Sequence, residues 1–355
     1  MMGEALEKVK VGSEEKSGDT LLRIRNLEKR FKMKHTLMDS ILRHPQQWLY
    51  AINDVSLDIH KGEILGLVGE SGCGKTTLAR LIIHLYEADG GVITLSGHDL
   101  TAMSKREFRS KSHDVQMIFQ DPFASLNPRM TVREILKEVL TVHKMCPPEK
   151  VEDRILELMD MVGLRHEFLD RLPAQFSGGQ RQRIGIARAL AMEPKIILAD
   201  EPVSALDVSI QAQIINLLKE LRDNLGLTLI FSSHELSVVR YIADKIAVMY
   251  LGRIVELSES EKLFRNPVHP YAEALLLATP EIDTEHREIR KPMLEGEPPS
   301  PMNLPKGCPF ATRCTYREDR CQQEVPELVS VEEEHWVRCV RAVERMKNYH
   351  ERGVL

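Results

Sequence analysis

The sequence lacks any uninterrupted apolar run of the roughly 18 residues that a membrane-spanning helix needs. Its longer apolar runs, such as Ile246–Leu251, have only the length of a strand. The N-terminal stretch Met1–Asp19 is rich in Glu, Lys, Gly and Ser and has no apolar core, which argues against a signal peptide or anchor there. We therefore expect a cytosolic protein that does not itself cross a bilayer.

An excess of basic charge is also missing. Lys and Arg number 48 against 53 Asp and Glu, which gives a formal net charge of −5. Proteins that coat nucleic acid normally carry a basic excess, so we expect no nucleic-acid partner. Hydrophobic residues at 43 % and charged residues at 28 % are ordinary for a packed globular chain.

Cysteine is scarce, and its distribution is uneven. Cys73 and Cys146 stand alone, and the other four of the six cysteines fall in the last fifth of the chain: Cys308, Cys314, Cys321 and Cys339. In a reducing compartment such a group favours metal binding over disulfides. The spacing C-x5-C-x6-C-x17-C lacks the C-x2-C pairs of common zinc ribbons, and thiolates suit both zinc and iron–sulfur clusters. Four buried free thiols remain the structural alternative.

Two kinds of strand pattern are present. Residues 21–60 alternate apolar and polar positions around an irregular insert, which predicts antiparallel strands with one wet face. Short continuous apolar runs predict a parallel sheet buried on both faces, with strands at Ile64–Val68, Val115–Phe119, Ile196–Ala199, Thr228–Phe231 and Ile246–Tyr250. Helical periods lie between these runs, and the sheet signal fades beyond Gly252. The proline-rich stretch Lys291–Lys306 predicts a stiff linker or clasp.

These patterns predict an α/β chain of several parts, in keeping with its 355 residues. We expect a flexible N-terminus over 1–20, a nucleotide-binding domain over 21–255 with a helical subdomain at about 123–180, an extension over 256–345, and a tail over 346–355.

The segment Gly69–Thr76 reads GESGCGKT and matches a P-loop. It follows a predicted strand and opens a predicted helix, Thr77–Tyr86, which is the context that the motif requires. Loop amides and the helix N-terminus can surround phosphates, while Lys75 adds a cation and the Thr76 hydroxyl reaches Mg²⁺. We expect ATP to contact Gly69, Ser71, Gly72, Cys73, Gly74, Lys75, Thr76 and Thr77.

The apolar strand Ile196–Ala199 ends in two adjacent carboxylates. At such a strand end, Asp200 can hold Mg²⁺ through water and Glu201 can act as general base toward an attacking water.

A second candidate phosphate cradle is Ser177–Gln180, reading SGGQ, at the start of a predicted helix. A second cradle in one domain is explained if Ser177, Gly178, Gly179 and Gln180 face the γ-phosphate bound by another copy. This predicts a head-to-tail dimer with nucleotide at the interface.

With these motifs in this order, residues 21–255 resemble the ATPase subunit of an ABC transporter. The resemblance implies a P-loop ATPase core with an antiparallel β subdomain and a helical subdomain. It places Phe31 against adenine, with Tyr50 as a competitor, and gives Gln120 the role of sensing Mg²⁺. It also implies that Asp207, in the loop Ser204–Asp207, contacts the dimer partner and that His234 contacts the γ-phosphate.

The rest of the chain is similar to oligopeptide and dipeptide importer ATPases, and to the second, F-type, of their paired subunits. The resemblance rests on Gln120–Met130, on Asn266–Tyr271, on the proline stretch and on Gly307–Cys314, and the likeness to the F-type subunit rests on the insert between Phe31 and Tyr50. It implies a [4Fe–4S] cluster on the four clustered cysteines, with zinc as the alternative.

The resemblance thus implies a subunit that hydrolyses ATP to power import, with Lys75, Gln120, Glu201 and His234 as catalytic residues and Thr76, Gln120 and Asp200 as Mg²⁺ ligands. The implied partners are a homologous ATPase chain, two permease subunits and an extracellular binding protein, at the cytoplasmic face of the membrane. A soluble ABC-type ATPase of macromolecular assembly, or an importer of nickel or sugars, is the alternative.

Overall fold

The computed structural model describes residues 20–33, 46–121, 125–278, 296–342 and 344–345. The expected flexible N-terminus and the tail therefore lie almost wholly outside the described residues, as do most of the insert before Tyr50 and part of the proline stretch. The twelve strands of the described part are β1 (Thr20–Lys32), β2 (Trp48–His60), β3 (Ile64–Val68), β4 (Gly90–Leu95), β5 (His98–Asp99), β6 (Val115–Ile118), β7 (Ile196–Asp200), β8 (Thr228–Ser233), β9 (Lys245–Tyr250), β10 (Arg253–Glu259), β11 (Val329–Glu332) and β12 (His335–Val337).

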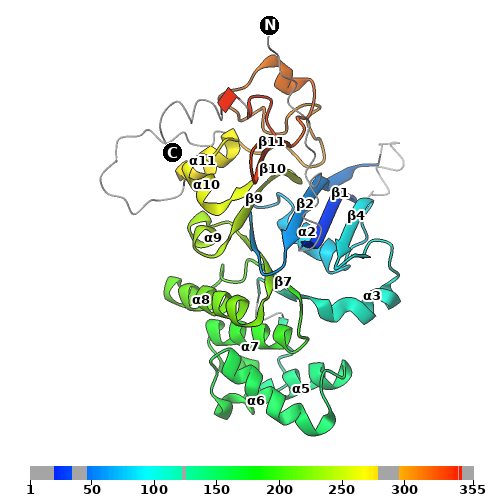
Figure 1. The fold of residues 1–355 in the computed structure, drawn as a ribbon, viewed down its shortest axis with the longest axis vertical. Helices are drawn as coiled ribbons and strands as arrows, with labels where there is room; N and C mark the ends of the chain where they lie inside the picture. Colours follow the sequence, from blue (N-terminus) through cyan, green and yellow to red (C-terminus); the bar gives the residue numbers. More distant parts are fainter. Residues whose placement is uncertain (1–19, 34–45, 122–124, 279–295, 343, 346–355) are drawn as a thin grey trace, which may run out of the picture.

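The α-helices lie mainly between these strands. They are α2 (Lys75–Ile82), α3 (Lys105–Lys111), α5 (Val132–Val142), α6 (Val151–Met161), α7 (Gly178–Leu190), α8 (Val208–Leu225), α9 (Leu236–Ile242), α10 (Ser260–Arg265) and α11 (Pro270–Ala278). Figure 1 shows α5, α6 and α7 gathered at one end of the molecule and the C-terminal segment, which is the described chain from residue 296 on, at the other, with the sheets between them. The expected limit of the helical subdomain at 180 falls inside α7.

The large sheet has the order β11-β12-β10-β9-β3-β8-β7-β6. Strands β9, β3, β8, β7 and β6 run parallel to one another, which confirms the parallel sheet predicted from the five apolar runs. Strand β3 shows why those runs are continuous: Ile64 and Val68 lie in one apolar core, and Leu65 and Leu67 in the other. A strand between two cores has no wet face and needs no polar alternation.

The smaller sheet, with the order β2-β1-β4-β5, is antiparallel, as residues 21–60 predict. Its apolar face shares the second core with α2 and with one face of the large sheet. The helix expected over Thr77–Tyr86 is α2, which begins at Lys75 and ends at Ile82. It stops there because His84 takes a left-handed backbone, φ 55°, which a helix cannot continue.

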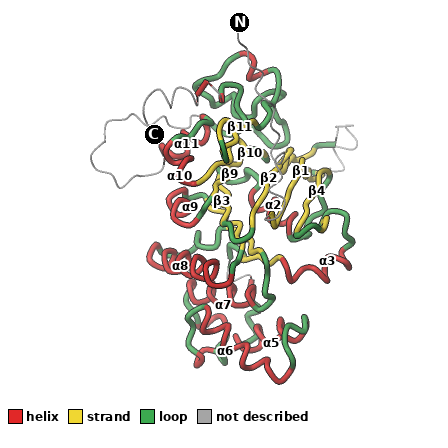
Figure 2. The backbone as a smooth tube through the Cα atoms, in the orientation of Figure 1, coloured by secondary structure: helices red, strands yellow, loops and turns green. Residues whose placement is uncertain are grey.

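The sheet itself continues beyond Gly252, where its signal in the sequence fades. Strand β10 pairs antiparallel with β9, and β12 and β11 extend the same sheet. The apolar signal fails because two inward positions of β10 are polar: Glu256 and Ser258 are fully buried. The expected boundary between residues 255 and 256 lies inside β10. Figure 2 shows that most of the described chain from residue 296 on is loop, attached to the sheet through these short strands.

Candidate functional site

The P-loop joins β3 to α2, and its path requires glycine at two close approaches. A Cβ on Gly69 would lie 2.2 Å from the Met249 carbonyl oxygen, and one on Gly74 would lie 2.6 Å from the Ala51 carbonyl oxygen. Both glycines also have positive φ, 149° and 116°. The loop is thereby held against β9 and β2, and it delivers Lys75 to the first turn of α2.

Lys75 is buried, with its side chain 5 % exposed. Its Nζ donates to the Gly69 carbonyl oxygen at 2.7 Å and lies 3.8 Å from the Glu201 carboxylate. Thr76 and Thr77 follow on the first helical turn and are half-buried, while Ser71 and Gly72 are exposed at the bend of the loop. A cation, a helix N-terminus and loop amides in one place form an anion site.

Glu201 lies at the centre of the expected catalytic group. Gln120 Nε2 donates to its carboxylate at 3.0 Å, His234 Nδ1 lies 3.6 Å away and Lys75 Nζ 3.8 Å away. The four residues follow β6, β8, β3 and β7, so they meet at the carboxyl edge of the parallel sheet. Open α/β sheets bind their ligands at that edge.

The backbone fixes where Glu201 points. Its φ of 46° is left-handed, a conformation that costs a residue with a side chain roughly 1–3 kcal/mol. Strand β8 holds it: the Glu201 N–H lies 3.1 Å from the Ser232 carbonyl oxygen and 3.0 Å from the Ser232 hydroxyl. The same hydroxyl donates to buried Asp200 at 2.7 Å. The side chains of Asp200 and Glu201 therefore point in different directions although the residues are adjacent.

Ser177 is the N-cap of α7. Its hydroxyl accepts the Gln180 N–H at 3.3 Å, and the Gln180 side-chain oxygen accepts the Ser177 N–H at 3.0 Å. This reciprocal capping box fixes the helix start, and the amides of Gly178 and Gly179 belong to the first turn. The geometry is that of a helix N-terminus suited to an anion.

The start of α7 packs on the loop that precedes α8. A Cβ on Gly179 would lie 2.3 Å from Ile210 Cγ2, and one on Gly178 would lie 3.1 Å from Leu206 Cδ2. Asp207 is the N-cap of α8, and its carbonyl oxygen accepts the Ile210 N–H at 2.9 Å. The SGGQ turn and the loop Ser204–Asp207 thus form one packed unit.

The two aromatic candidates for adenine lie on neighbouring strands. Phe31, near the end of β1, is half-buried and meets Tyr86 edge-on with ring centroids 5.1 Å apart. Tyr50 lies on β2, and its backbone N–H donates to the Pro301 carbonyl oxygen at 3.0 Å. The proline stretch therefore clasps β2 at this residue.

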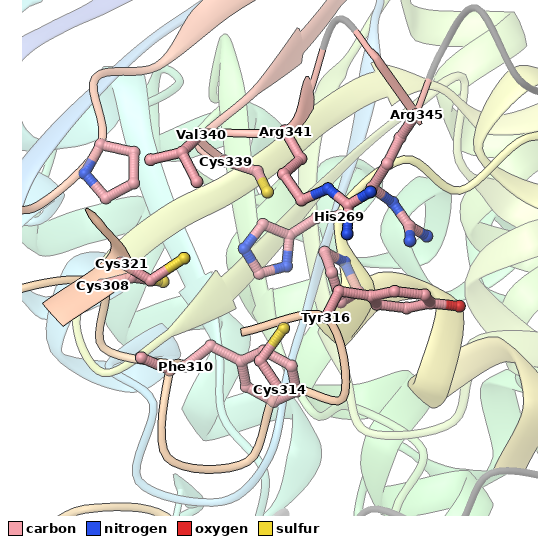
Figure 3. A pocket seen from close by; sticks show the side chains of 13 residues that line it. His269, Cys308, Phe310, Cys314, Tyr316, Cys321, Cys339, Val340, Arg341 and Arg345 are labelled. Carbon is pink, nitrogen blue, oxygen red and sulfur yellow. The ribbon is translucent and has the colours of Figure 1, made fainter. Parts of the chain in front are cut away.

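The four clustered cysteines line one pocket in the C-terminal segment. Figure 3 shows Cys314 and Cys339 approaching its space from opposite sides, with Cys308 and Cys321 together at a third. Burial raises the pKa of Cys308 to about 12 and that of Cys339 to about 11. Within the residues that the structure describes, no three His, Cys, Asp or Glu side chains form a group that could hold a single metal ion.

A buried polar network that no sequence motif indicated joins β10, the residues before α11, and β12. Fully buried Glu256 accepts His335 Nε2 at 2.7 Å and the backbone N–H groups of Val268 and His269 at 2.9 and 2.7 Å. Burial lowers the pKa of His269 to about 3. The sequence signal for this network was the pair of polar residues, Glu256 and Ser258, within the buried middle of β10.

Comparison with known proteins agrees with this fold and site. The family described as "ABC transporter" matches residues 52–204, and "Oligopeptide/dipeptide transporter, C-terminal region" matches residues 255–321. Among solved structures, the dimeric post-hydrolysis ATP-binding cassette MJ0796 bound to ADP and Pi has a TM-score of 0.59 at 30 % identity, covering 68 % of this chain and 99 % of that one. The fold and site are those of an ATP-binding cassette ATPase.

The curated relatives narrow this class. The chain is 46 % identical over 324 residues to the oligopeptide transport ATP-binding protein AppF of Bacillus subtilis, covering 90 % of this chain and 97 % of that protein. It is 51 % identical over 286 residues to OppF of Salmonella typhimurium, covering 80 % and 86 %. The chain belongs to the ATP-binding proteins of the oligopeptide/dipeptide branch of ABC transporters.

Proposed function

We propose that this chain binds and hydrolyses ATP to drive import of oligopeptides or dipeptides. The observation that carries the proposal is the meeting of Lys75, Gln120 and His234 around Glu201 at the mouth of a P-loop. The cargo class comes from the matched C-terminal region and from relatives named for oligopeptide transport.

The chemistry follows from the positions of the side chains. Loop amides and Lys75 bind the β- and γ-phosphates, and the oxygens of Thr76, Gln120 and Asp200 suit Mg²⁺, which prefers hard oxygen ligands and would neutralise phosphate charge. Glu201 takes the proton of the attacking water. His234, whose Nδ1 lies 3.6 Å from the Glu201 carboxylate, contacts the γ-phosphate in this proposal.

The working unit in this proposal is a dimer of two homologous ATPase chains. The dimeric state of the similar cassette MJ0796 supports it, as does the anion-suited turn at Ser177–Gln180, which would close on nucleotide held by the partner. Two permease subunits, served by an extracellular binding protein, supply the membrane path. Nowhere in the described residues is a helix long and apolar enough to span a bilayer. The proposed role as the ATPase partner of the permease places this chain on the cytoplasmic side, docked to the permease.

A [4Fe–4S] cluster on Cys308, Cys314, Cys321 and Cys339 is part of the proposal. The fit rests on four thiols from distant positions lining one pocket. No three His, Cys, Asp or Glu side chains of the described residues are placed as a group that could hold a metal ion, so the choice of a cluster over zinc rests on the resemblance to peptide-importer ATPases. The cluster would supply four covalent cross-links to a segment that is mostly loop.

The function is tested by uptake in proteoliposomes that contain the permease subunits, both ATPase chains and the binding protein. We expect ATP-dependent accumulation of labelled peptide that is lost in Lys75→Ala. Accumulation of nickel or a sugar, but not of peptide, would contradict the peptide cargo and identify a different one. Co-purification of the chain with ribosomes or DNA instead of permease would favour the soluble ATPase.

The cluster is tested by measuring iron, acid-labile sulfide and zinc in anaerobically purified protein. We expect about four irons and four sulfides per chain, as a [4Fe–4S] centre requires, and loss of both in Cys314→Ser. Cys146→Ser is the matched control, because Cys146 does not line the pocket. Metal content that is unchanged in Cys314→Ser would contradict the proposed site.

A further inference from the structure

The C-terminal segment touches the phosphate-binding loop directly, at a residue that the catalytic scheme leaves without a role. Glu70 is the second residue of the P-loop. Its carboxylate oxygens accept hydrogen bonds from the two terminal guanidinium nitrogens of Arg313, Nη1 at 2.7 Å and Nη2 at 3.0 Å. Arg313 comes from 243 residues further along the chain, and its side chain is 4 % exposed. The contact is a two-pronged, charge-assisted ion pair, the geometry in which arginine binds carboxylate most specifically.

A second contact fixes the backbone of the same residue. The Glu70 N–H donates to the Tyr271 hydroxyl at 2.9 Å. Tyr271 is fully buried, and its ring lies 4.6 Å from that of Tyr250 and 5.4 Å from that of Phe310. Main chain and side chain of one loop residue are therefore both held by groups outside the loop.

The negative charge of Glu70 makes its pairing with Arg313 important for phosphate binding. A carboxylate in a loop that binds polyphosphate repels the ligand unless a cation neutralises it. Arg313 supplies that charge from outside the loop, so Lys75 remains directed at the loop carbonyls, with its Nζ 2.7 Å from the Gly69 oxygen and 3.5 Å from the Glu70 oxygen. A loop that is already ordered also loses less conformational freedom on binding.

We propose that Arg313 and Tyr271 are positioning residues for nucleotide binding: the C-terminal segment clamps Glu70 and so sets the shape and charge of the phosphate-binding loop. This inference rests on the proposed function of that loop.

The experiment is calorimetric titration of the full-length chain with Mg–ATP, which gives the Kd and the number of sites per chain. We expect Arg313→Gln to raise the Kd about tenfold with the number of sites unchanged, and Arg313→Lys to recover part of the affinity. Arg320→Gln is the matched control: Arg320 also precedes a cysteine and binds a glutamate, Glu318, at 2.6 Å, but that pair lies wholly within the C-terminal segment. We expect its Kd to be unchanged.

The double variant Glu70→Gln/Arg313→Gln tests whether Arg313 acts through Glu70. We expect it to bind ATP no more weakly than Arg313→Gln alone, and Tyr271→Phe to raise the Kd in the same direction. Equal Kd values in Arg313→Gln and unmodified protein, a fall in the number of sites at constant Kd, or additive losses in the double variant would each overturn the proposal. Lys75→Ala separates the two ideas, because undiminished ATP binding in that variant contradicts the loop's function itself.

Discussion

At the scale of the residue, the interpretation of the catalytic group depends mainly on the carboxylate of Glu201. Glu201 is aimed by its backbone, since a left-handed φ of 46° turns the chain away from the direction of β7 immediately after Asp200. Two hydrogen-bond acceptors on Ser232 hold this conformation. Strain that is retained against a cost of roughly 1–3 kcal/mol is typical of a functional position, and here it turns Glu201, the proposed general base, away from Asp200, the proposed Mg²⁺ ligand.

The first prediction therefore concerns Glu201→Gln. The amide keeps the size of the side chain but cannot accept the proton of the attacking water, so we expect ATP hydrolysis to fall by roughly 10²- to 10⁴-fold while Mg–ATP binding persists. Phosphate release and nucleotide binding measured on the same preparation check this. Glu220→Gln is the control, because Glu220 is exposed on α8. Turnover of Glu201→Gln at the unmodified rate would exclude the general-base role.

At the scale of the element, the sequence pattern locates strands well where burial is apolar and fails where it is polar. Strands β3, β6, β7, β8 and β9 are found because both faces meet apolar cores. Strand β10 is missed because Glu256 and Ser258 interrupt its pattern. Glu256 can be buried because it is paired with His335, which lies 79 residues away in the chain. A local sequence pattern cannot predict a contact over that separation.

Helix α7 offers a second prediction with an internal control. A Cβ on Gly179 would lie 2.3 Å from Ile210 Cγ2, whereas one on Gly185 in the same helix meets nothing within 4 Å. We expect Gly179→Ala to lower the free energy of unfolding by about 1–3 kcal/mol, as overpacking does. Gly185→Ala should raise it by about 0.5–1 kcal/mol, because alanine favours the helix. Urea denaturation of both variants measures this, and equal effects would contradict the close packing of α7 on α8.

At the scale of the whole molecule, the C-terminal segment is built into the ATPase core. Strand β12 continues the large sheet, Arg338 donates to the Ile254 carbonyl oxygen at 3.0 Å, and Pro301 accepts from Tyr50. The P-loop and the SGGQ turn could be recognised from short motifs because each lies within a few residues. The clamp of Arg313 on Glu70 could not, because the two residues are 243 positions apart in the chain and only folding brings them together.

The attachment of β12 to β10 predicts a pH dependence that belongs to this long-range architecture. Burial acts to lower the pKa of His335, but the hydrogen bonds and charges of Glu256 and Glu332 outweigh it and raise that pKa above 6.5. The ion pair is therefore fully present below about pH 6.5 and is lost as pH rises through the raised value, since the folded state then releases the proton. We expect His335→Gln to lower the free energy of unfolding by about 1–3 kcal/mol near pH 6 and by progressively less at higher pH, in urea titrations at each pH.

His166→Gln is the control. It removes a pair of the same 2.7 Å length, to Asp160, but that pair is exposed and should contribute little to the free energy of unfolding. A His335→Gln deficit that stays constant or grows with pH would show that the buried pair is not what attaches the segment.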